Sequence, residues 1–360
     1  MRILQVITSL QTGGAEKLIV DIVPMLRQRG LEVDVCIFNG KDTPFKRQLE
    51  ECGCKIYCLS HDERYYSPIK IYRLWRIMRH YDIVHTHNTA PQLFAAIANI
   101  LSRKKLVTTE HSTNSRRKDY PILRYGDKWM YSQYDSVICI SDIAATILKD
   151  YLGIEESHNN IITINNGIDV ERFYKAQPID RKSVGSNDSS FVIAMVAGFR
   201  EAKDQETVIR AIANLHDSKF ELWLVGDGVR RKEVENCIAT EQVESQVKLL
   251  GVRMDVPSIL KSADVVVMSS HWEGLSLSNI EGMSVGKPFI ASDVNGLREV
   301  TQGYGILFPH GDDEALANEI KHLAEDRDYY NQIASQCYER AKQFDIRKMV
   351  DAYANVYEEL

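Results

Sequence analysis

Residues 136–140 read Ser-Val-Ile-Cys-Ile, a nearly continuous apolar run with no alternation of polar and apolar positions. A strand carries such a run when both its faces are buried, as in a parallel sheet with helices on either side. Comparable runs occupy residues 2–7 and 192–196, and amphipathic helical patterns such as Ala15–Arg29, closed by Gly30, lie between runs of this kind. The chain is therefore predicted to be an α/β protein with doubly wound parallel sheets.

The length of 360 residues exceeds what a single core normally supports, so two domains of roughly 150–200 residues are expected. The alternation of strands and helices breaks at a polar stretch, and a second series of strands begins after it. We expect domains at residues 1–170 and 191–344, separated by a linker at 171–190. A C-terminal helix at 345–360 is expected to pack back toward the first domain.

Hydrophobic residues make up 44% of the chain and charged residues 26%, which is typical of a soluble globular enzyme. No apolar run approaches the ~20 residues that span a bilayer, and the N-terminus reads as a first strand rather than a signal peptide. The seven cysteines lack zinc-type spacing and are expected to be reduced thiols. We therefore expect a cytoplasmic protein.

The net charge of −6 is unevenly distributed, because residues 1–170 carry a net positive charge and the remainder a net negative one. Part of the basic excess stands at helical spacing, at Lys70, Arg73, Arg76 and Arg79. Two interpretations stay open: a solvated helix face, or weak attraction to an anionic membrane on its inner side or to a phosphate-bearing acceptor. Nothing in the sequence indicates nucleic-acid binding, and the oligomeric state cannot be inferred from it.

Two glutamates, Glu273 and Glu281, follow the apolar run at residues 264–268. We expect Glu273 in the loop after a strand and Glu281 in the first turn of the next helix, where open backbone amides attract anions. Carboxylates bind hydroxyls and helix N-termini bind phosphates, so a sugar diphosphate would suit the pair. Ser278 and Glu281 also fit a capping box, in which Glu281 would only bind a backbone amide.

Two further loops follow predicted strands. Arg200 and Lys203 come after the strand at 192–196 and would suit a diphosphate leaving group, although they could equally be solvated loop cations. Gly13 and Gly14 follow the first strand and permit either a tight turn or close approach of backbone to an anion. The spacing is not G-x-G-x-x-G, which argues against a dinucleotide site.

In this order along the chain, the motifs resemble those of the retaining glycosyltransferases of family 4. The motifs are Gly13-Gly14-Ala15-Glu16, Asp82–His87, Thr109-Glu110-His111, Asn166-Gly167-Ile168-Asp169, Lys203-Asp204, Val225-Gly226-Asp227-Gly228, Leu250-Gly251, Glu273-Gly274-Leu275 through Glu281, and Gly286-Lys287-Pro288. The resemblance implies the GT-B fold: two Rossmann-like domains facing across a cleft, the N-terminal one for the acceptor and the C-terminal one for the nucleotide sugar.

The resemblance also implies roles for single residues. His111, Glu273 and Lys203 are the implied catalytic residues, His111 beside the transferred sugar, Glu273 on the donor sugar and Lys203 on the phosphates. Glu281 would bind the ribose hydroxyls. The other implied donor-binding residues are Gly14, Arg200, Leu250, Gly251, Val252, Gly274, Leu275, Ser276, Leu277 and Ser278.

Two positions depart from the family pattern. Gly198 stands where an arginine is common, and Arg200 is a candidate to supply that charge. Gly282 stands where alanine is usual, a change between small residues that we expect to matter little beyond helix propensity.

No metal or cofactor is expected. Asp326 and Asp328, the one D-x-D pair, lie in a helical stretch and read as a solvated face. His85 and His87 are expected to be core or hydrogen-bonding residues whose side chains point to opposite faces of a strand, rather than metal ligands.

The predicted function is transfer of a sugar from a nucleoside diphosphate donor to a hydroxyl of a saccharide or lipid-linked acceptor, in cell-surface polysaccharide or glycoconjugate synthesis. UDP is the first choice of nucleotide and GDP the second. Two alternatives stay open: a nucleotide-sugar epimerase or hydrolase on the same scaffold, and a non-catalytic partner subunit of glycosyltransferase type.

Overall fold

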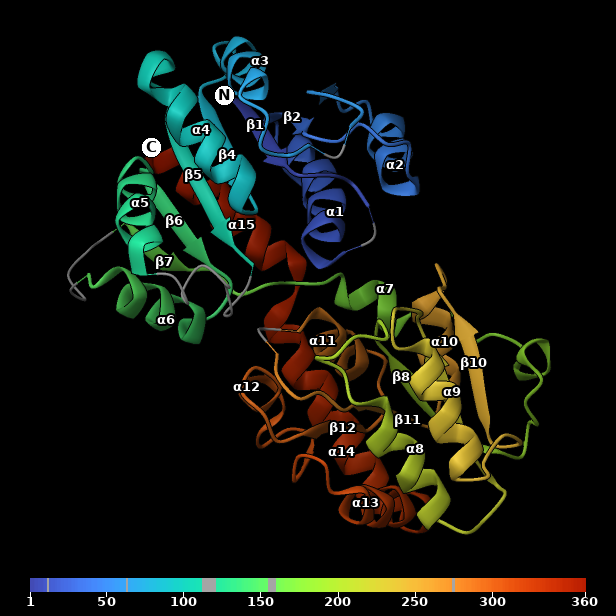
Figure 1. Ribbon diagram of the computed structural model, residues 1–360. Helices are drawn as coiled ribbons and strands as arrows, with labels where there is room; N and C mark the ends of the chain where they lie inside the picture. Colours follow the sequence, from blue (N-terminus) through green and yellow to red (C-terminus); the bar gives the residue numbers. More distant parts are fainter. Residues whose placement is uncertain (12, 63, 112–120, 155–159, 274–275) are drawn as a thin grey trace. The chain divides into compact units, whose positions relative to one another are not determined.

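Parallel strands alternate with helices along almost the whole chain (Figure 1). The computed structural model describes residues 1–11, 13–62, 64–111, 121–154, 160–273 and 276–360. By its internal contacts the chain divides into two units: unit 1 comprises Met1–Asn166 with Arg347–Leu360, and unit 2 comprises Gly167–Ile346. The predicted α/β class and the two Rossmann-like sheets are confirmed.

The described part of unit 1 contains a parallel sheet of seven strands in the order β3-β2-β1-β4-β5-β6-β7. The strands are β1 (Arg2–Ile7), β2 (Glu32–Ile37), β3 (Ile56–Cys58), β4 (Ile83–His87), β5 (Lys105–Glu110), β6 (Ser136–Cys139) and β7 (Ile161–Thr163). The helices are α1 (Gly14–Gln28), α2 (Pro44–Glu51), α3 (Ile69–Met78), α4 (Thr89–Ser102), α5 (Pro121–Ser132), α6 (Asp142–Leu152) and α15 (Ile346–Glu359). β6 is buried along its whole length, as expected of a parallel strand with a neighbour on each side.

The C-terminal helix α15 completes unit 1 (Figure 1). Tyr353 and Tyr357 lie one turn apart on α15, and both are fully buried. Tyr357 accepts a hydrogen bond from Gln5 of β1, and Arg29 at the end of α1 donates to Asp351 at 2.9 Å. The first strand and the last helix of the chain therefore belong to one core.

The described part of unit 2 contains a parallel sheet of six strands in the order β10-β9-β8-β11-β12-β13. The strands are β8 (Phe191–Val196), β9 (Phe220–Val225), β10 (Val247–Gly251), β11 (Val265–Met268), β12 (Phe289–Ser292) and β13 (Ile306–Phe308). The helices are α7 (Val170–Tyr174), α8 (Gln205–Asn214), α9 (Arg231–Thr240), α10 (Val256–Ser262), α11 (Leu277–Ser284), α12 (Leu297–Thr301), α13 (Asp313–Glu325) and α14 (Arg327–Ala341), with short 3₁₀ turns at Arg181–Val184 and Lys342–Phe344.

The expected linker at 171–190 is instead part of unit 2. Arg181 anchors it, because its guanidinium donates to the carbonyls of Ser262 and Ser190 and forms an ion pair with Asp264 at 2.9 Å. The polar composition of this stretch, which suggested a linker, supplies these hydrogen bonds. It folds against the strand ends of its own unit.

The strand order reverses between β1 and β4 in unit 1 and between β8 and β11 in unit 2. At such a point the connections leave the sheet in opposite directions, and ligands bind outside the carboxyl ends of the strands. In unit 2 the loop after β8 carries Lys203 and the loop after β11 carries Glu273. The topology therefore brings together two residues that are 70 positions apart.

All seven cysteines are free. Among the described helices, none combines the length and the apolar character needed to cross a bilayer.

Candidate active site

Backbone hydrogen bonds hold the loop after β8 against the loop after β11. Lys203 and Ser270 form an isolated antiparallel bridge. On either side of it, the Asp204 amide donates to the Ser269 carbonyl at 3.1 Å, and the His271 amide donates to the Ala202 carbonyl at 2.9 Å. The two loops therefore behave as one short ribbon at the carboxyl ends of the central strands.

This ribbon places the Lys203 ammonium in an ion pair with the Glu273 carboxylate. Their side chains are 17% and 14% exposed, so the pair is largely withdrawn from water but still reachable. The Ser270 hydroxyl donates a second hydrogen bond to the same Glu273 oxygen at 3.0 Å. Two of the three predicted catalytic residues thus contact each other within unit 2.

Burial lowers the pKa of Lys203 to about 8, and the positive charge of Arg200 acts in the same direction. Contact with the Glu273 carboxylate favours the charged ammonium and opposes both effects. Lys203 is therefore a cation near neutral pH whose charge is poorly hydrated. An anion that approached it would interact with it strongly.

Arg200 is exposed and lies close enough to Lys203 for their charges to interact. Its Nε atom would be 3.5 Å from a Cβ atom on Gly198. The Arg200 side chain thus lies beside the position at which the family pattern has its arginine. A guanidinium and an ammonium side by side suit a diphosphate, which presents several oxygens to both.

Helix α11 begins at Leu277, earlier than the sequence suggested. Ser276 is its N-cap residue and makes no capping bond with its side chain, while Ser278 lies inside the helix. The capping box with Ser278 at the N-cap is therefore wrong, and so is the placement of Glu281 in the first turn. Glu281 lies in the second turn, half-buried. Gly274 and Leu275 lie outside the described residues.

The remaining predicted residues of unit 2, Leu250, Gly251 and Val252, lie at the carboxyl end of β10. Gly251 adopts a left-handed conformation with φ +65°, and its carbonyl accepts from the Gly226 amide at 2.8 Å. The turn leaves the Val252 side chain 67% exposed. An apolar side chain is thus presented at the same edge of the sheet as Lys203.

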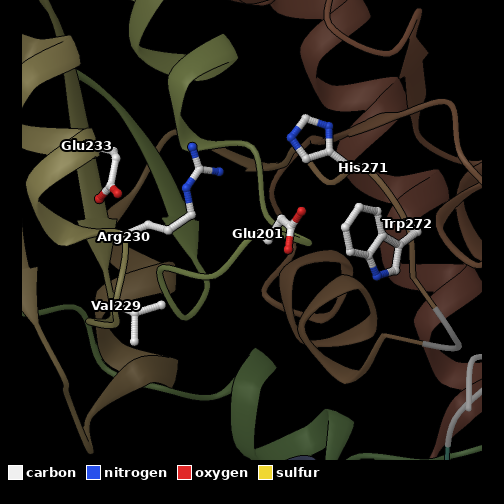
Figure 2. A pocket seen from close by; sticks show the side chains of 6 residues that line it. All are labelled: Glu201, Val229, Arg230, Glu233, His271 and Trp272. Carbon is white, nitrogen blue, oxygen red and sulfur yellow. The ribbon is translucent and has the colours of Figure 1, made fainter. Parts of the chain in front are cut away.

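A cavity of about 530 Å³ opens beside this edge, and Figure 2 shows the six side chains that line it. They are Glu201, Val229, Arg230, Glu233, His271 and Trp272. The rings of His271 and Trp272 lie on one side of the cavity, with Arg230 and Glu233 on the other (Figure 2). None of these six residues was predicted from the sequence. The sequence signal for this cavity was Trp272 directly before Glu273, since aromatic faces bind sugars and bases. The structure shows that this side chain is exposed.

In unit 1, His111 follows β5 and begins a chain of hydrogen bonds. Its Nε2 atom lies 2.9 Å from His87 Nδ1, and His87 Nε2 lies 2.8 Å from the Gln5 amide oxygen. Gln5 in turn donates to the Tyr357 hydroxyl at 3.0 Å. Since the Gln5 oxygen can only accept, His87 Nε2 carries its proton, and a neutral His87 then accepts from His111 Nε2.

This arrangement assigns His111 the tautomer protonated at Nε2. Burial lowers the pKa of His111 to about 4, so the ring is neutral at pH 7. The lone pair of Nδ1 is then available to accept a hydrogen bond from a ligand hydroxyl. Gln5, His87 and Tyr357 position His111, and the sequence signal for them was a glutamine inside an otherwise apolar strand.

The expectation that His85 and His87 point to opposite faces is wrong. Residues two apart on a strand share a face, and the two rings stack with centroids 4.4 Å apart. His85 contacts the Tyr357 hydroxyl at 2.6 Å and the Thr109 hydroxyl at 2.8 Å. Both histidines are fully buried with hydrogen-bond partners, as predicted for core histidines.

Gly14 is the first residue of α1, and it is exposed. The N-cap residue Gly13 is extended and makes no side-chain capping bond, and the Glu16 carboxylate lies beside it. Gly14 therefore lies at the N-terminus of α1, next to a carboxylate.

Two family models match the chain. The model for glycosyl transferases group 1 matches residues 176–343, and the model for glycosyltransferase family 4 matches residues 12–172. Between them they cover almost all of the chain, and they meet within a few residues of the boundary between the units.

Individual relatives are similar over most of their length. The UDP-Gal:alpha-D-GlcNAc-diphosphoundecaprenol alpha-1,3-galactosyltransferase of Escherichia coli is 28% identical over 81% of this chain and 78% of its own. The lipopolysaccharide core biosynthesis glycosyltransferase LpsD of Rhizobium meliloti is 26% identical over 96% of this chain and 95% of its own. The crystal structure of Anabaena HepE in complex with UDP and glucose has a TM-score of 0.88 at 26% identity and covers 100% of both chains.

Proposed function

The chain belongs to the family 4 glycosyltransferases, and from that premise we propose that it transfers a sugar from a UDP-sugar to a hydroxyl of a saccharide or lipid-linked acceptor. Support for UDP comes from HepE, whose crystal structure contains UDP and glucose. Support for the acceptor class comes from relatives that act on a diphosphoundecaprenol-linked sugar or in lipopolysaccharide core synthesis. The observation that carries the proposal is the Lys203–Glu273 pair.

The diphosphate leaves with growing negative charge as the bond to the sugar breaks. Lys203 and Arg200 would stabilise this charge, together with the backbone amides at the start of α11. These groups supply positive charge without a metal ion. The proposed transfer is accordingly metal-independent, and it should continue in the presence of a strong chelator.

We propose that the transfer retains the anomeric configuration, as the family resemblance implies, and the surroundings of Glu273 indicate how. A double displacement needs a carboxylate that attacks the anomeric carbon. Glu273 instead shares its charge with Lys203 and accepts from Ser270, which makes it a weak nucleophile and a suitable partner for sugar hydroxyls. We therefore favour departure and attack on the same face through an oxocarbenium-like state, with the leaving phosphate taking the acceptor proton. Trapping a covalent glycosyl–Glu273 adduct would refute this choice.

For His111 we propose, as the family resemblance implies, that its neutral Nδ1 accepts a hydrogen bond from a hydroxyl of the transferred sugar. A neutral acceptor is useful here, because a protonated ring would add a positive charge beside the oxocarbenium-like sugar. His111→Asn should lower kcat more than the affinity for UDP, since UDP lacks the sugar that His111 would contact.

The decisive experiment concerns Glu281, for which we propose ribose binding. Glu281→Ala should weaken UDP binding about 10–100-fold, the effect of losing hydrogen bonds to a charged group. Pyrophosphate lacks the ribose, so calorimetry should give the same pyrophosphate affinity for the variant and the parent. Glu319→Ala, an exchange on helix α13, is the matched control. If Glu281→Ala binds UDP with the affinity of the parent, Glu281 does not bind the ribose and this part of the proposal is wrong.

The purified protein and a UDP-sugar also distinguish the proposed transfer from the two alternative functions. An epimerase or hydrolase would convert a UDP-sugar with no acceptor present, which product analysis would reveal. A non-catalytic subunit would bind no nucleotide sugar at all.

We also propose peripheral contact of unit 1 with an anionic membrane. Helices α3 and α4 pack together and expose apolar side chains beside cations. The exposed residues are Tyr66, Ile69, Tyr72, Arg73, Arg76, Arg79, Ile100, Leu101 and Arg103. Lys70 does not belong to this face as the sequence suggested, because it is buried and paired with Asp62 at 3.2 Å. Co-sedimentation with phosphatidylglycerol vesicles should fall on Arg76→Glu, and equal binding by parent and variant would count against the contact.

A further inference from the structure

We propose that Asp204, His271 and His310 form a binding site for a divalent transition-metal ion of the zinc class. The three residues belong to different segments of unit 2, and one ligand atom from each lies within 4.8 Å of the other two. The site is separate from the groups proposed above to act on the donor. Its failure would leave the proposed transfer untouched.

Asp204 supplies a buried carboxylate to this cluster. It is 3% exposed, accepts from the Thr207 amide at 3.1 Å as the N-cap of α8, and accepts from the Ser269 hydroxyl at 3.1 Å. An ionised carboxylate can accept about four hydrogen bonds, and a buried one is costly to keep charged without a cation. Among the described residues no ion pair involves Asp204; Arg210 is near enough for their charges to interact, but its guanidinium pairs with Asp313 at 3.1 Å.

The two histidines turn ring nitrogens toward one another. His271 follows β11 and His310 follows β13, and His271 Nδ1 lies 2.7 Å from His310 Nε2. Two lone pairs cannot face each other at this distance without a proton or a cation between them. In a tetrahedral zinc site the ligand atoms lie about 3.3 Å apart, so the three groups, which lie within 4.8 Å of one another, would have to shift by up to about 1.5 Å.

The ligand set selects the class of ion. Imidazole nitrogens suit zinc, nickel, cobalt and copper, whereas magnesium and calcium prefer oxygen ligands throughout. Three protein ligands leave a fourth position for water. His271 also lines the cavity of Figure 2, so that position is next to space that a small molecule can enter.

Such an ion would hold the loops after β8 and β11 together. Asp204 directly follows Lys203 in the chain, and His271 lies two residues before Glu273. An ion bound to both would fasten the ribbon that holds the Lys203–Glu273 pair, and His310 would tie that ribbon to the end of β13. The ion would touch neither member of the pair.

The test uses full-length protein without a histidine tag, stripped with a chelator. Titration of Zn²⁺ against a chromophoric chelator should show one tight ion per chain, and Co²⁺ should give the visible absorption of a four-coordinate site. Saturating Zn²⁺ at about 100 times Kd should raise Tm by roughly 5–10 °C. His310→Gln should weaken Zn²⁺ binding by at least the roughly 10–100-fold that loss of a supporting ligand partner costs.

His322→Gln provides the matched control, because His322 is another exposed histidine of unit 2 beside an aspartate, Asp326 at 3.9 Å. The His322→Gln variant should bind Zn²⁺ with the same affinity as the parent. Equal affinity in the parent and both variants would overturn the site, as would a Co²⁺ spectrum of six-coordinate character. UDP affinity measured in chelator reports on the donor site independently, so the two proposals can fail separately.

Discussion

At the scale of single residues, Gly282 shows how tightly the core beneath α11 is packed. A Cβ atom at this position would lie 2.5 Å from the Phe289 ring and 2.8 Å from Val266 Cγ1. The expectation that glycine and the usual alanine are interchangeable here is therefore wrong. The large Phe289 ring of β12 fills the space that an alanine methyl would need.

Gly282→Ala should consequently destabilise the protein. Overpacking costs about 1–3 kcal/mol, and the better helix propensity of alanine returns up to about 1 kcal/mol. Gly126→Ala in α5 is the matched control, because a Cβ atom there meets nothing within 4 Å and only the propensity gain remains. Urea unfolding should separate the two variants by about 1–3 kcal/mol. Equal stability would mean that Phe289 moves aside without cost.

At the scale of secondary-structure elements, α15 stabilises unit 1 through the hydroxyl of Tyr357. Tyr357 Oη binds both the Gln5 amide and His85 Nδ1 in a fully buried setting. Tyr357→Phe would leave both of these groups without their partner, at a cost of about 1–3 kcal/mol. The free energy of unfolding from urea titration measures this cost.

Tyr353→Phe is the comparison for that measurement. The Tyr353 hydroxyl lies 3.4 Å from Thr109 Oγ1, a long and weak contact, so its removal should cost clearly less. If both variants lose the same free energy, the contribution of α15 comes from its rings and not from the hydrogen bonds of Tyr357.

At the scale of the whole molecule, the buried histidines predict acid sensitivity. Burial lowers the pKa of His85 to about 3, and it lowers the pKa of His87 well below the ordinary value. The unfolded chain binds protons at these rings near pH 6.5, while the folded chain does not. Stability from this source is therefore complete above pH 6.5 and is lost as the pH falls from there toward 3.

Each such histidine adds about 1.4 kcal/mol per pH unit to the slope of unfolding free energy within that window. Urea titrations at pH 7, 6 and 5 on the parent and on His85→Gln should show a slope smaller by about that amount in the variant. Comparing slopes removes the contribution of carboxylates common to both proteins. If the unfolding free energies of the parent and the variant change with pH at the same slope, His85 titrates in the folded state as it does in the unfolded chain.

The parts of the fold that could be predicted from sequence rest on local pattern. Apolar runs such as Ser136–Cys139 indicated central parallel strands, and the order of loops after strands brought Lys203 and Glu273 to one sheet edge. The helix start at Leu277 was missed because Ser278 and Glu281 satisfy a capping pattern that the backbone does not use. The side chains that position His111 were missed because Gln5 and Tyr357 are separated by 352 residues. Pairing over such a distance leaves no local signal.

The chain order has a further consequence for synthesis. Unit 2 is inserted between residue 166 and residue 347 of unit 1, so it emerges from the ribosome complete while unit 1 still lacks α15. Domains fold largely as units during translation. Unit 2 can therefore finish folding first, and Gln5 and His85 acquire their hydrogen-bond partner only after Tyr357 has been made. A nascent chain stalled before Tyr357 would hold a folded unit 2 and a unit 1 in which Gln5 and His85 still lack their hydrogen-bond partner.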